Sequence, residues 1–205
     1  MIVLFFDTET TGIPSDTFKP EIVQLAAILC DMDNGRTLAE INVIVDNPES
    51  EVPKIVSDIH GITTDIMHKF GVGVSTADEL FATLLSQADR LVAHNIEFDI
   101  QLLKDNLRMS RAVLENHTAN GRLDTYCTML NARDILKLPF TSKQEYYYRV
   151  NNIMPDLPYR GPRLIEAFRH FHKKDFADAH NAMADVKACR AVYSSIQAFN
   201  QQKEA

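Results

Sequence analysis

An unbroken apolar run at the start of the chain is followed directly by two acidic side chains. Met1 to Phe6 consists of β-branched, aromatic and large aliphatic residues, a pattern typical of a strand buried on both faces. Asp7 and Glu9 follow at a spacing of two, which on a strand places both carboxylates on one face, about 6–7 Å apart. Negative charge at the end of a buried strand is unfavourable unless a positive group compensates it. A divalent cation is the natural candidate; the alternative is that the strand ends there and water solvates both acids.

Two later stretches place further acidic residues where helices are expected to begin. Residues 91–99 read as a short apolar strand leading into a helix, with Asp99 in its first turn. Residues 179–186 contain His180 and, five residues later, Asp185 at the start of another helix. Each stretch alone is weak evidence, because a helix dipole favours an acidic residue in the first turn of any helix.

Together and in this order, the three stretches resemble the motifs of the DEDDh 3′–5′ exonucleases, the family of proofreading and RNase T-like exonucleases. The matching residues are Asp7, Glu9, Asp99, His180 and Asp185. Supporting matches are the segments Ile59-His60-Gly61-Ile62-Thr63 and Leu123-Asp124-Thr125. The resemblance extends over nearly the whole chain.

The order of the expected elements favours an α/β fold. Strands are expected at 1–6, 21–30, 37–45, 90–93 and 121–125, with a hairpin at Asn34-Gly35. Helices are expected at 75–88, with Ser75 or Thr76 as N-cap, and from Asn95 as N-cap to about 107. Further helices are expected from the end of the last strand to about 136, at 163–172 and at 182–201. The resemblance implies an RNase H-like fold: a five-stranded mixed sheet with its second strand antiparallel and helices on both faces. The site would lie at the carboxyl end of the first strand, as in other open α/β sheets.

Residues 139–162 are the least regular part of the pattern. We predict an insert there, with one short helix, within a single domain of residues 1–205. The segment interleaves arginines with Tyr146, Tyr147, Tyr148 and Tyr159, and single-stranded nucleic acid is held by backbone charge and by aromatic faces under the bases. We hypothesise that it guides the strand to the site; the alternative is that the tyrosines pack the insert onto the body.

Charge gives a mixed signal about nucleic-acid binding. The formal net charge is −7, which argues against strong nonspecific binding to a polyanion. Residues 133–174, however, contain nine Lys or Arg against four Asp or Glu, a local net charge of +5. A basic segment within an acidic protein can still be a nucleic-acid footprint.

Cysteine usage and hydropathy bear on the cellular compartment. Cys30, Cys127 and Cys189 are scattered and form no Cys-x-x-Cys pair, so a zinc site or disulfide framework is not expected and a reducing compartment fits. The start of the chain has no secretory pattern, and no apolar run has the length of a membrane span. We therefore expect a cytoplasmic protein without a membrane partner.

The resemblance also implies roles for the matching residues. Two divalent cations, Mg²⁺ or Mn²⁺, would be held by oxygen ligands, with Asp7 bridging both. Glu9 and Asp185 would complete the site that holds the attacking water, and Asp99 would serve the second ion through water. His180 would be the general base, because its ordinary pKa lies near neutrality.

Four further residues are candidates for holding the terminal nucleotide: Thr10, His60, Asn95 and Phe98. Two of them have structural alternatives, since Phe98 is spaced as a core residue and His60 could cap a short helix. We interpret His94 as a structural residue at a strand end, and Asp124 as a helix N-cap rather than a fifth metal ligand.

The expected activity is a metal-dependent 3′–5′ exonuclease that releases nucleoside 5′-monophosphates from single-stranded 3′ ends, with DNA favoured over RNA. Polymerase proofreading, as a subunit or companion of a DNA polymerase, is the leading context. One alternative is an RNA 3′-end trimming enzyme of the same family, which uses the same carboxylates. Another is an inactive binding module on a nuclease fold, against which the complete acidic set and His180 argue.

Overall fold

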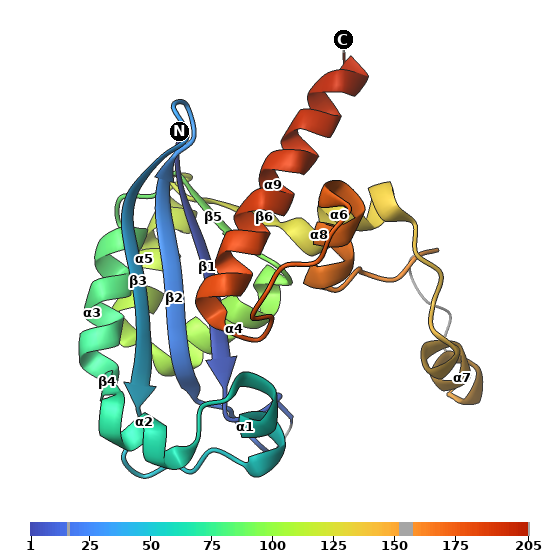
Figure 1. Ribbon diagram of the computed structural model, residues 1–205. Coiled ribbons are helices and arrows are strands. Elements are labelled where there is room, and N and C mark those ends of the chain that lie inside the picture. The colour runs from blue at the N-terminus through green and yellow to red at the C-terminus, as the bar shows by residue number, and fades with distance from the viewer. Residues whose placement is uncertain (16, 152–157, 205) are drawn as a thin grey trace.

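The computed structural model describes residues 1–15, 17–151 and 158–204 (Figure 1). Within these residues the strands form one six-stranded sheet in the order β4-β3-β2-β1-β5-β6. The strands are β1 (Ile2–Thr10), β2 (Ile22–Asp31), β3 (Arg36–Asp46), β4 (Val72–Gly73), β5 (Arg90–Ala93) and β6 (Asp124–Cys127). The helices are α1 (Lys54–His60), α2 (Thr64–Phe70), α3 (Val74–Leu85), α4 (Ile96–Asn106), α5 (Arg108–Ala119), α6 (Thr128–Leu136), α7 (Ser142–Val150), α8 (Leu164–His172) and α9 (Ala182–Glu204).

The sheet is mixed, and its second strand is antiparallel to both neighbours. β2 pairs antiparallel with β1 and with β3, whereas β5 pairs parallel with β1, and β6 parallel with β5. The predicted RNase H-like α/β class is therefore confirmed. The predicted count of five strands is wrong, because the two-residue β4 adds a parallel edge beside Val45 and Asp46. A strand of two residues is too short to produce an alternating pattern in the sequence.

β1 is longer than its apolar run suggests. Its pairing with β2 continues from Ile2 to Thr10, with an irregularity between Glu9 and Thr10. The expectation that the strand ends at Phe6 is therefore wrong. Residues 7–10 belong to the strand because they pair with β2, and the hydrophobicity of the sequence does not reveal this pairing. As a result, Asp7 lies within the strand and Glu9 lies at its last regular position.

Alternate residues of β1 enter two separate cores. Val3 and Phe5 pack with Val186 and Tyr193 of α9, on one face of the sheet. The other face of β1 packs, with Phe6, against α3, α4 and α5. Figure 1 shows this arrangement, with α9 lying across one face and the green helices α3 and α5 behind the other. All four residues Val3 to Phe6 are fully buried, as the sequence predicts.

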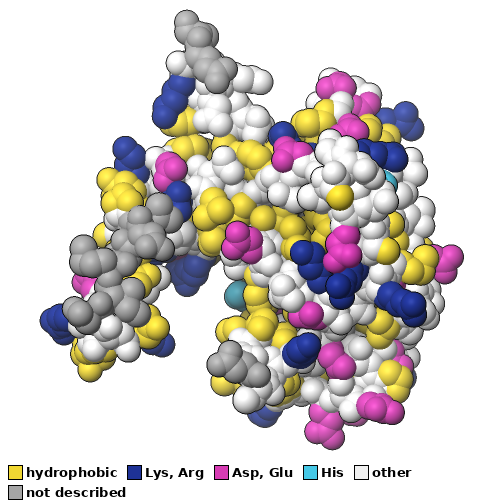
Figure 2. Space-filling view, turned by 180° about the vertical axis from the view of Figure 1, so that it is seen from behind, with side chains coloured by type: hydrophobic (Ala, Val, Ile, Leu, Met, Phe, Trp, Pro, Cys, Tyr) yellow, Lys and Arg dark blue, Asp and Glu magenta, His cyan; other side chains and the backbone are white. Residues whose placement is uncertain are grey.

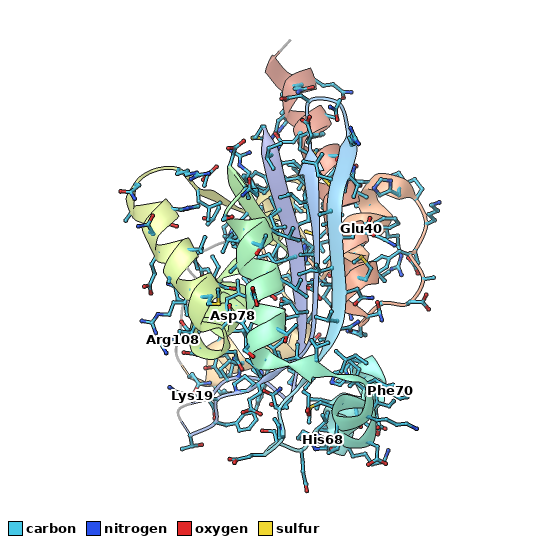
Figure 3. All side chains as sticks on the ribbon, turned by 90° about the vertical axis from the view of Figure 1, so that its left-hand side faces the viewer. Lys19, Glu40, His68, Phe70, Asp78 and Arg108 are labelled. Carbon is cyan, nitrogen blue, oxygen red and sulfur yellow. The ribbon has the colours of Figure 1, made fainter. Side chains whose placement is uncertain are left out.

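Two helices that the sequence pattern did not reveal are α2 and α5. The start of α5 has no capping side chain of its own; instead the buried Asp78 of α3 accepts hydrogen bonds from the backbone N–H groups of Met109 (2.7 Å) and Ser110 (2.8 Å). Figure 3 shows Asp78 of α3 beside Arg108 at the start of α5. Because the cap comes from another helix, no local signal precedes α5.

Other boundary predictions also need correction. The helix predicted at 75–88 begins at Val74 with Gly73 as N-cap, so neither Ser75 nor Thr76 has that role. Asn95 precedes α4, but it adopts a left-handed conformation (φ 78°) and its side chain makes no capping bond within the described chain. Asp124 begins β6 and pairs with Arg90 at 2.6 Å, so it does not cap a helix.

The predicted insert contains the expected short helix, α7, and its residues 152–157 lie outside the described structure. In Figure 1, α7 projects away from the sheet and its covering helices. Among the helices of the described residues, none has the length and apolar character needed to cross a membrane.

Candidate active site

Three carboxylates meet where β1 ends and α9 begins. Asp7 and Glu9 share the sheet face that α9 covers, because odd-numbered residues of β1 point to that side. Asp185 lies in the first turn of α9. One carboxylate oxygen from each of these three residues lies within 4.8 Å of the others. The spacing of two on β1 and the helix-start position of Asp185 therefore bring these sequence-predicted residues together.

Asp99 approaches the same place from α4. It lies in the first turn of that helix and is only 3% exposed. The Thr8 hydroxyl donates a hydrogen bond to Asp99 Oδ1 at 2.9 Å. Asp99 is not one of the three residues of the close cluster, yet its charge acts on Asp7 and Glu9. Thr8 thus fixes the orientation of the fourth predicted acid.

Burial and mutual repulsion disfavour charge on these acids. Burial, followed by the charges of Asp99, Asp185 and Glu9, raises the pKa of Asp7 well above its ordinary value. Burial, reinforced by Asp185 and Asp99, raises the pKa of Glu9 to about 8. Burial raises the pKa of Asp99 to about 7, against the opposing hydrogen bond from Thr8. The site therefore contains more acidic groups than the surrounding protein can stabilise as anions.

His180 reaches the cluster through its backbone. Its N–H donates to Asp185 Oδ2 at 3.2 Å, and its ring is exposed. This bond and the charge of the histidine lower the pKa of Asp185, but burial outweighs them and raises it to about 6. His180 has a left-handed backbone (φ 69°), an unfavourable conformation for a residue other than glycine that is often found at functional sites.

The four candidate nucleotide-binding residues have different surroundings. The Thr10 hydroxyl donates to the carbonyl of Gly12 at 2.7 Å and closes the turn after β1. Asn95 is exposed at the start of α4, whereas Phe98 is partly buried and packs against the core. Phe98 therefore has the structural role that its spacing suggests, with part of its ring still accessible.

His60 lies at the end of α1, near His180. Its Nδ1 accepts a hydrogen bond from the N–H of Ile62 at 3.1 Å. Burial lowers its pKa, and the charge of His180 acts in the same direction. Its Nε2 is buried and has no hydrogen-bond partner among the described residues. The backbone of Thr10 lies close enough to the ring to oppose the effect of burial on the pKa of His60.

His94 is a structural residue, as its position at a strand end suggests. Its ring contacts the Thr128 hydroxyl and the carbonyl of Pro162, each at 2.9 Å. Burial lowers its pKa to about 4, so the ring is neutral near pH 7. A carbonyl can only accept, so Nε2–H donates to Pro162 and Nδ1 accepts from Thr128. His94 thereby attaches the end of the predicted insert beside the start of α4.

Sequence reasoning overlooked two polar residues that support the site, Thr8 and Gln24. Thr8 bonds Asp99 as described above, and the Gln24 side chain accepts a hydrogen bond from the backbone N–H of Ala182, the first residue of α9, at 3.2 Å. The available signal was a glutamine within the apolar stretch Ile22 to Cys30. A buried amide in such a strand requires a specific partner.

The model of the RNase T-type exonuclease family matches residues 4–193. The chain belongs to this exonuclease family. The predicted family and enzyme class, an exonuclease, are thus confirmed. Divalent metals are generally used in this family, and the acidic cluster suits them.

Two relatives are named as DNA polymerase III proteins. The chain is 25% identical over 201 residues to DNA polymerase III subunit epsilon of Treponema pallidum, covering 95% of this chain and 76% of that protein. It is 29% identical over 113 residues to the PolC-type DNA polymerase III of Clostridium perfringens, covering 54% of this chain and 7% of that much longer protein.

Solved structures of exonuclease I share the fold. Exonuclease I of Escherichia coli in complex with a dT13 oligonucleotide has a TM-score of 0.66 at 17% identity, covering 99% of this chain and 42% of that one. The enzyme from Methylocaldum szegediense has a TM-score of 0.64 at 18% identity, with 96% and 40% covered. The chain thus spans less than half of the exonuclease I structures.

Proposed function

We propose that this exonuclease removes nucleotides from single-stranded 3′ ends of DNA and releases nucleoside 5′-monophosphates. The observation that carries the proposal is the meeting of Asp7, Glu9 and Asp185 within 4.8 Å, with His180 bonded to the last of them. The names of the relatives support DNA as the polymer, since they are DNA polymerase III proteins and an exonuclease bound to dT13.

The residues present fit divalent cations. Carboxylate oxygens are hard ligands, which suit Mg²⁺ or Mn²⁺. Burial raises the pKa of Asp7 and Glu9, and the charged groups that act on them are other acids, which raise it further. We propose that Asp7, Glu9 and Asp185, together with Asp99, hold two such ions. When bound, the ions would activate water and neutralise charge on the phosphate oxygens.

The protein's own side chains would perform the remaining tasks. His180 is exposed beside Asp185 and would accept the proton of the attacking water as general base. Thr8 would keep Asp99 oriented through its hydroxyl. Asn95, Thr10, His60 and the accessible part of Phe98 would hold the terminal nucleotide.

A role beside a DNA polymerase is the cellular context that the relatives favour. Both relatives are DNA polymerase III proteins by name, and we propose proofreading as a subunit or companion of such an enzyme. The cysteines Cys30, Cys127 and Cys189 are free and buried, which fits the reducing environment of the cytoplasm.

The proposal is tested with single-stranded DNA and RNA oligomers of the same sequence, labelled at either end. Mg²⁺ or Mn²⁺ should produce stepwise shortening of 5′-labelled DNA and immediate mononucleotide release from 3′-labelled DNA, and a chelator should abolish both. Faster release from RNA would reassign the enzyme to RNA trimming. Binding without release in either metal would instead indicate an inactive binding module.

A further inference from the structure

Gln24 is a buried amide in β2, which is otherwise apolar from Ile22 to Cys30. It is 5% exposed and lies on β2, among residues that are nearly all buried. Its Oε1 accepts a hydrogen bond from the N–H of Ala182 at 3.2 Å, and its Nε2 donates to Oδ1 of Asn42 at 2.9 Å. An apolar side chain would pack here without any need for hydrogen-bond partners, so the amide requires another explanation.

The register of the sheet places this amide beside the acidic cluster. Gln24 lies directly opposite Glu9 in the pairing of β1 with β2, and Asn42 lies opposite Ala26 in the pairing of β2 with β3. Residues opposite each other in antiparallel strands share a face. Glu9, Gln24 and Asn42 therefore form a polar row across three strands, on the face where α9 begins.

The other hydrogen bonds of the segment that precedes α9 include local ones, from the His180 N–H to Asp185 and from the Asn181 N–H to the carbonyl of Asp178. Asp178 and His180 both have left-handed backbones, with φ of 58° and 69°. The Asn181 side chain accepts from the N–H of Ala184 at a long 3.4 Å. A cavity of about 470 Å³ adjoins this segment, and its lining includes Asn42, Phe176, Asp178 and Asn181.

We propose that Gln24, braced by Asn42, is a positioning residue that fixes the start of α9 and thereby sets where His180 and Asp185 stand relative to Asp7 and Glu9. The bond to Ala182 anchors the chain between these two residues, two positions after His180 and three before Asp185. The inference rests on the proposed function for its catalytic consequence, but not for its structural one. Misplacement of catalytic groups by about 1 Å can lower a rate by about 10²-fold.

Three variants separate positioning from general stability. Gln24→Met keeps the length of the side chain and removes both the acceptor for Ala182 and the donor to Asn42. Ser110→Ala is the matched control, because it removes a buried hydrogen bond to Asp78 (2.6 Å) on the opposite side of the sheet. Asn42→Ala removes only the acceptor for the Gln24 amide, and it replaces Gln24→Met in the test if that variant does not fold.

Two readouts are needed, and one requires no metal. In the metal-free protein, Gln24→Met should speed amide hydrogen exchange of residues 180–185 by about tenfold or more, while Ser110→Ala stays near wild type. With Mn²⁺ and a dinucleotide substrate, kcat of Gln24→Met should fall by about 10- to 100-fold with little change in KM. Asn42→Ala should change the exchange rate and kcat in the same directions as Gln24→Met, each by a smaller factor.

The outcomes are decisive in both directions. Unchanged exchange at residues 180–185 in Gln24→Met, or in Asn42→Ala where that variant is used, overturns the proposal whatever the enzyme hydrolyses. Exchange at residues 180–185 that speeds up as much in Ser110→Ala as in Gln24→Met would also overturn it, because the effect would then reflect general stability. Wild-type protein that releases no nucleotide would refute the proposed function and leave the exchange result to decide the anchoring role.

Discussion

Four acidic residues from three elements create a local excess of negative charge. Asp7 and Glu9 come from β1, Asp99 from α4 and Asp185 from α9. The pKa of each is raised, and burial is the first cause in every case. A folded protein that keeps such groups together gains stability from whatever neutralises them, either protons or cations.

The metal-free protein should lose stability as pH rises from about 6.5 to about 8.5. The pKa of Glu9 is raised from 4.5 to about 8, so the folded state binds the proton more tightly than the unfolded chain. Its contribution is complete below pH 4.5 and is lost as pH passes about 8. The lowered pKa of His94 has the opposite effect, because stability rises with pH until the unfolded chain loses this proton near pH 6.5. The predicted loss of stability is therefore best measured above about pH 6.5.

Thermal melting in a chelator checks this expectation. Tm should fall across the window, the fall should be smaller in Glu9→Gln, and Mn²⁺ should raise Tm most at the alkaline end because ligands bind it deprotonated. A metal-free Tm that is constant or rises over the same range would contradict the electrostatic account of the cluster.

Replacing the exposed histidine should affect chemistry and not metal affinity. His180→Ala is expected to lower the rate by about 10²–10⁴-fold, the usual contribution of a general base. Its N–H bond to Asp185 is a backbone contact, so the substitution leaves that contact available. Calorimetric titration with Mn²⁺ should give a nearly unchanged Kd, and a large loss of affinity would identify the His180 ring as a ligand instead.

At the scale of secondary-structure elements, the sequence predicted the elements whose boundaries are determined by residues close by in the chain. The apolar run of β1 and the helix-start acids were recognisable because each signal lies within a few residues of the element it marks. The start of α5 was not, because its cap is Asp78 on α3. Gln24 was missed for the same reason: its partner Ala182 is 158 residues away. Contacts across the fold therefore determine the supporting parts of the site.

The α7 arm, defined here as residues 139–151, is attached at its base and exposed beyond it. Arg160 donates to the carbonyls of Leu138 and Pro139, from its N–H and its Nε respectively, each at 3.1 Å, and pairs with Glu166 at 2.8 Å. Of the nine α7 residues, all described, none is buried. In Figure 2 the arm stands apart from the body, with a hollow between them.

Exposed aromatic and cationic groups on this arm fit the hypothesis that it holds the strand. Tyr146 and Tyr147 are 59% and 56% exposed, and Arg149 lies over the Tyr146 ring at 5.7 Å. Such groups can stack with bases and contact phosphates of a single strand. Their exposure does not favour the alternative that these two tyrosines pack α7 onto the body.

Replacing residues 139–151 with a Gly-Ser linker should raise KM for long oligomers much more than for a dinucleotide. The log–log dependence of binding on salt should also flatten by about 0.7 for each phosphate that the arm neutralises in the wild-type complex. The variant must still melt cooperatively, and Ser110→Ala provides a control for a modest loss of stability. An unchanged salt slope would assign the arm to packing or to a protein partner.

At the scale of the whole molecule, the fold brings three distant segments together at the carboxyl end of β1. β1 ends there, α4 begins beside it after β5, and α9 crosses the adjacent face (Figure 1). The family match covers residues 4–193, which includes all three. The central claim is that the acids at the carboxyl end of β1 perform metal-dependent hydrolysis at the 3′ end of a DNA strand.

The most direct test of that claim is the rate of mononucleotide release from 3′-labelled single-stranded DNA by Asp7→Asn and by wild type, in Mn²⁺. We expect wild type to release the label and Asp7→Asn to be inactive, while its metal-free Tm is equal to or above that of wild type because one repelling charge is gone. An Asp7→Asn variant that retains the wild-type rate would contradict the account.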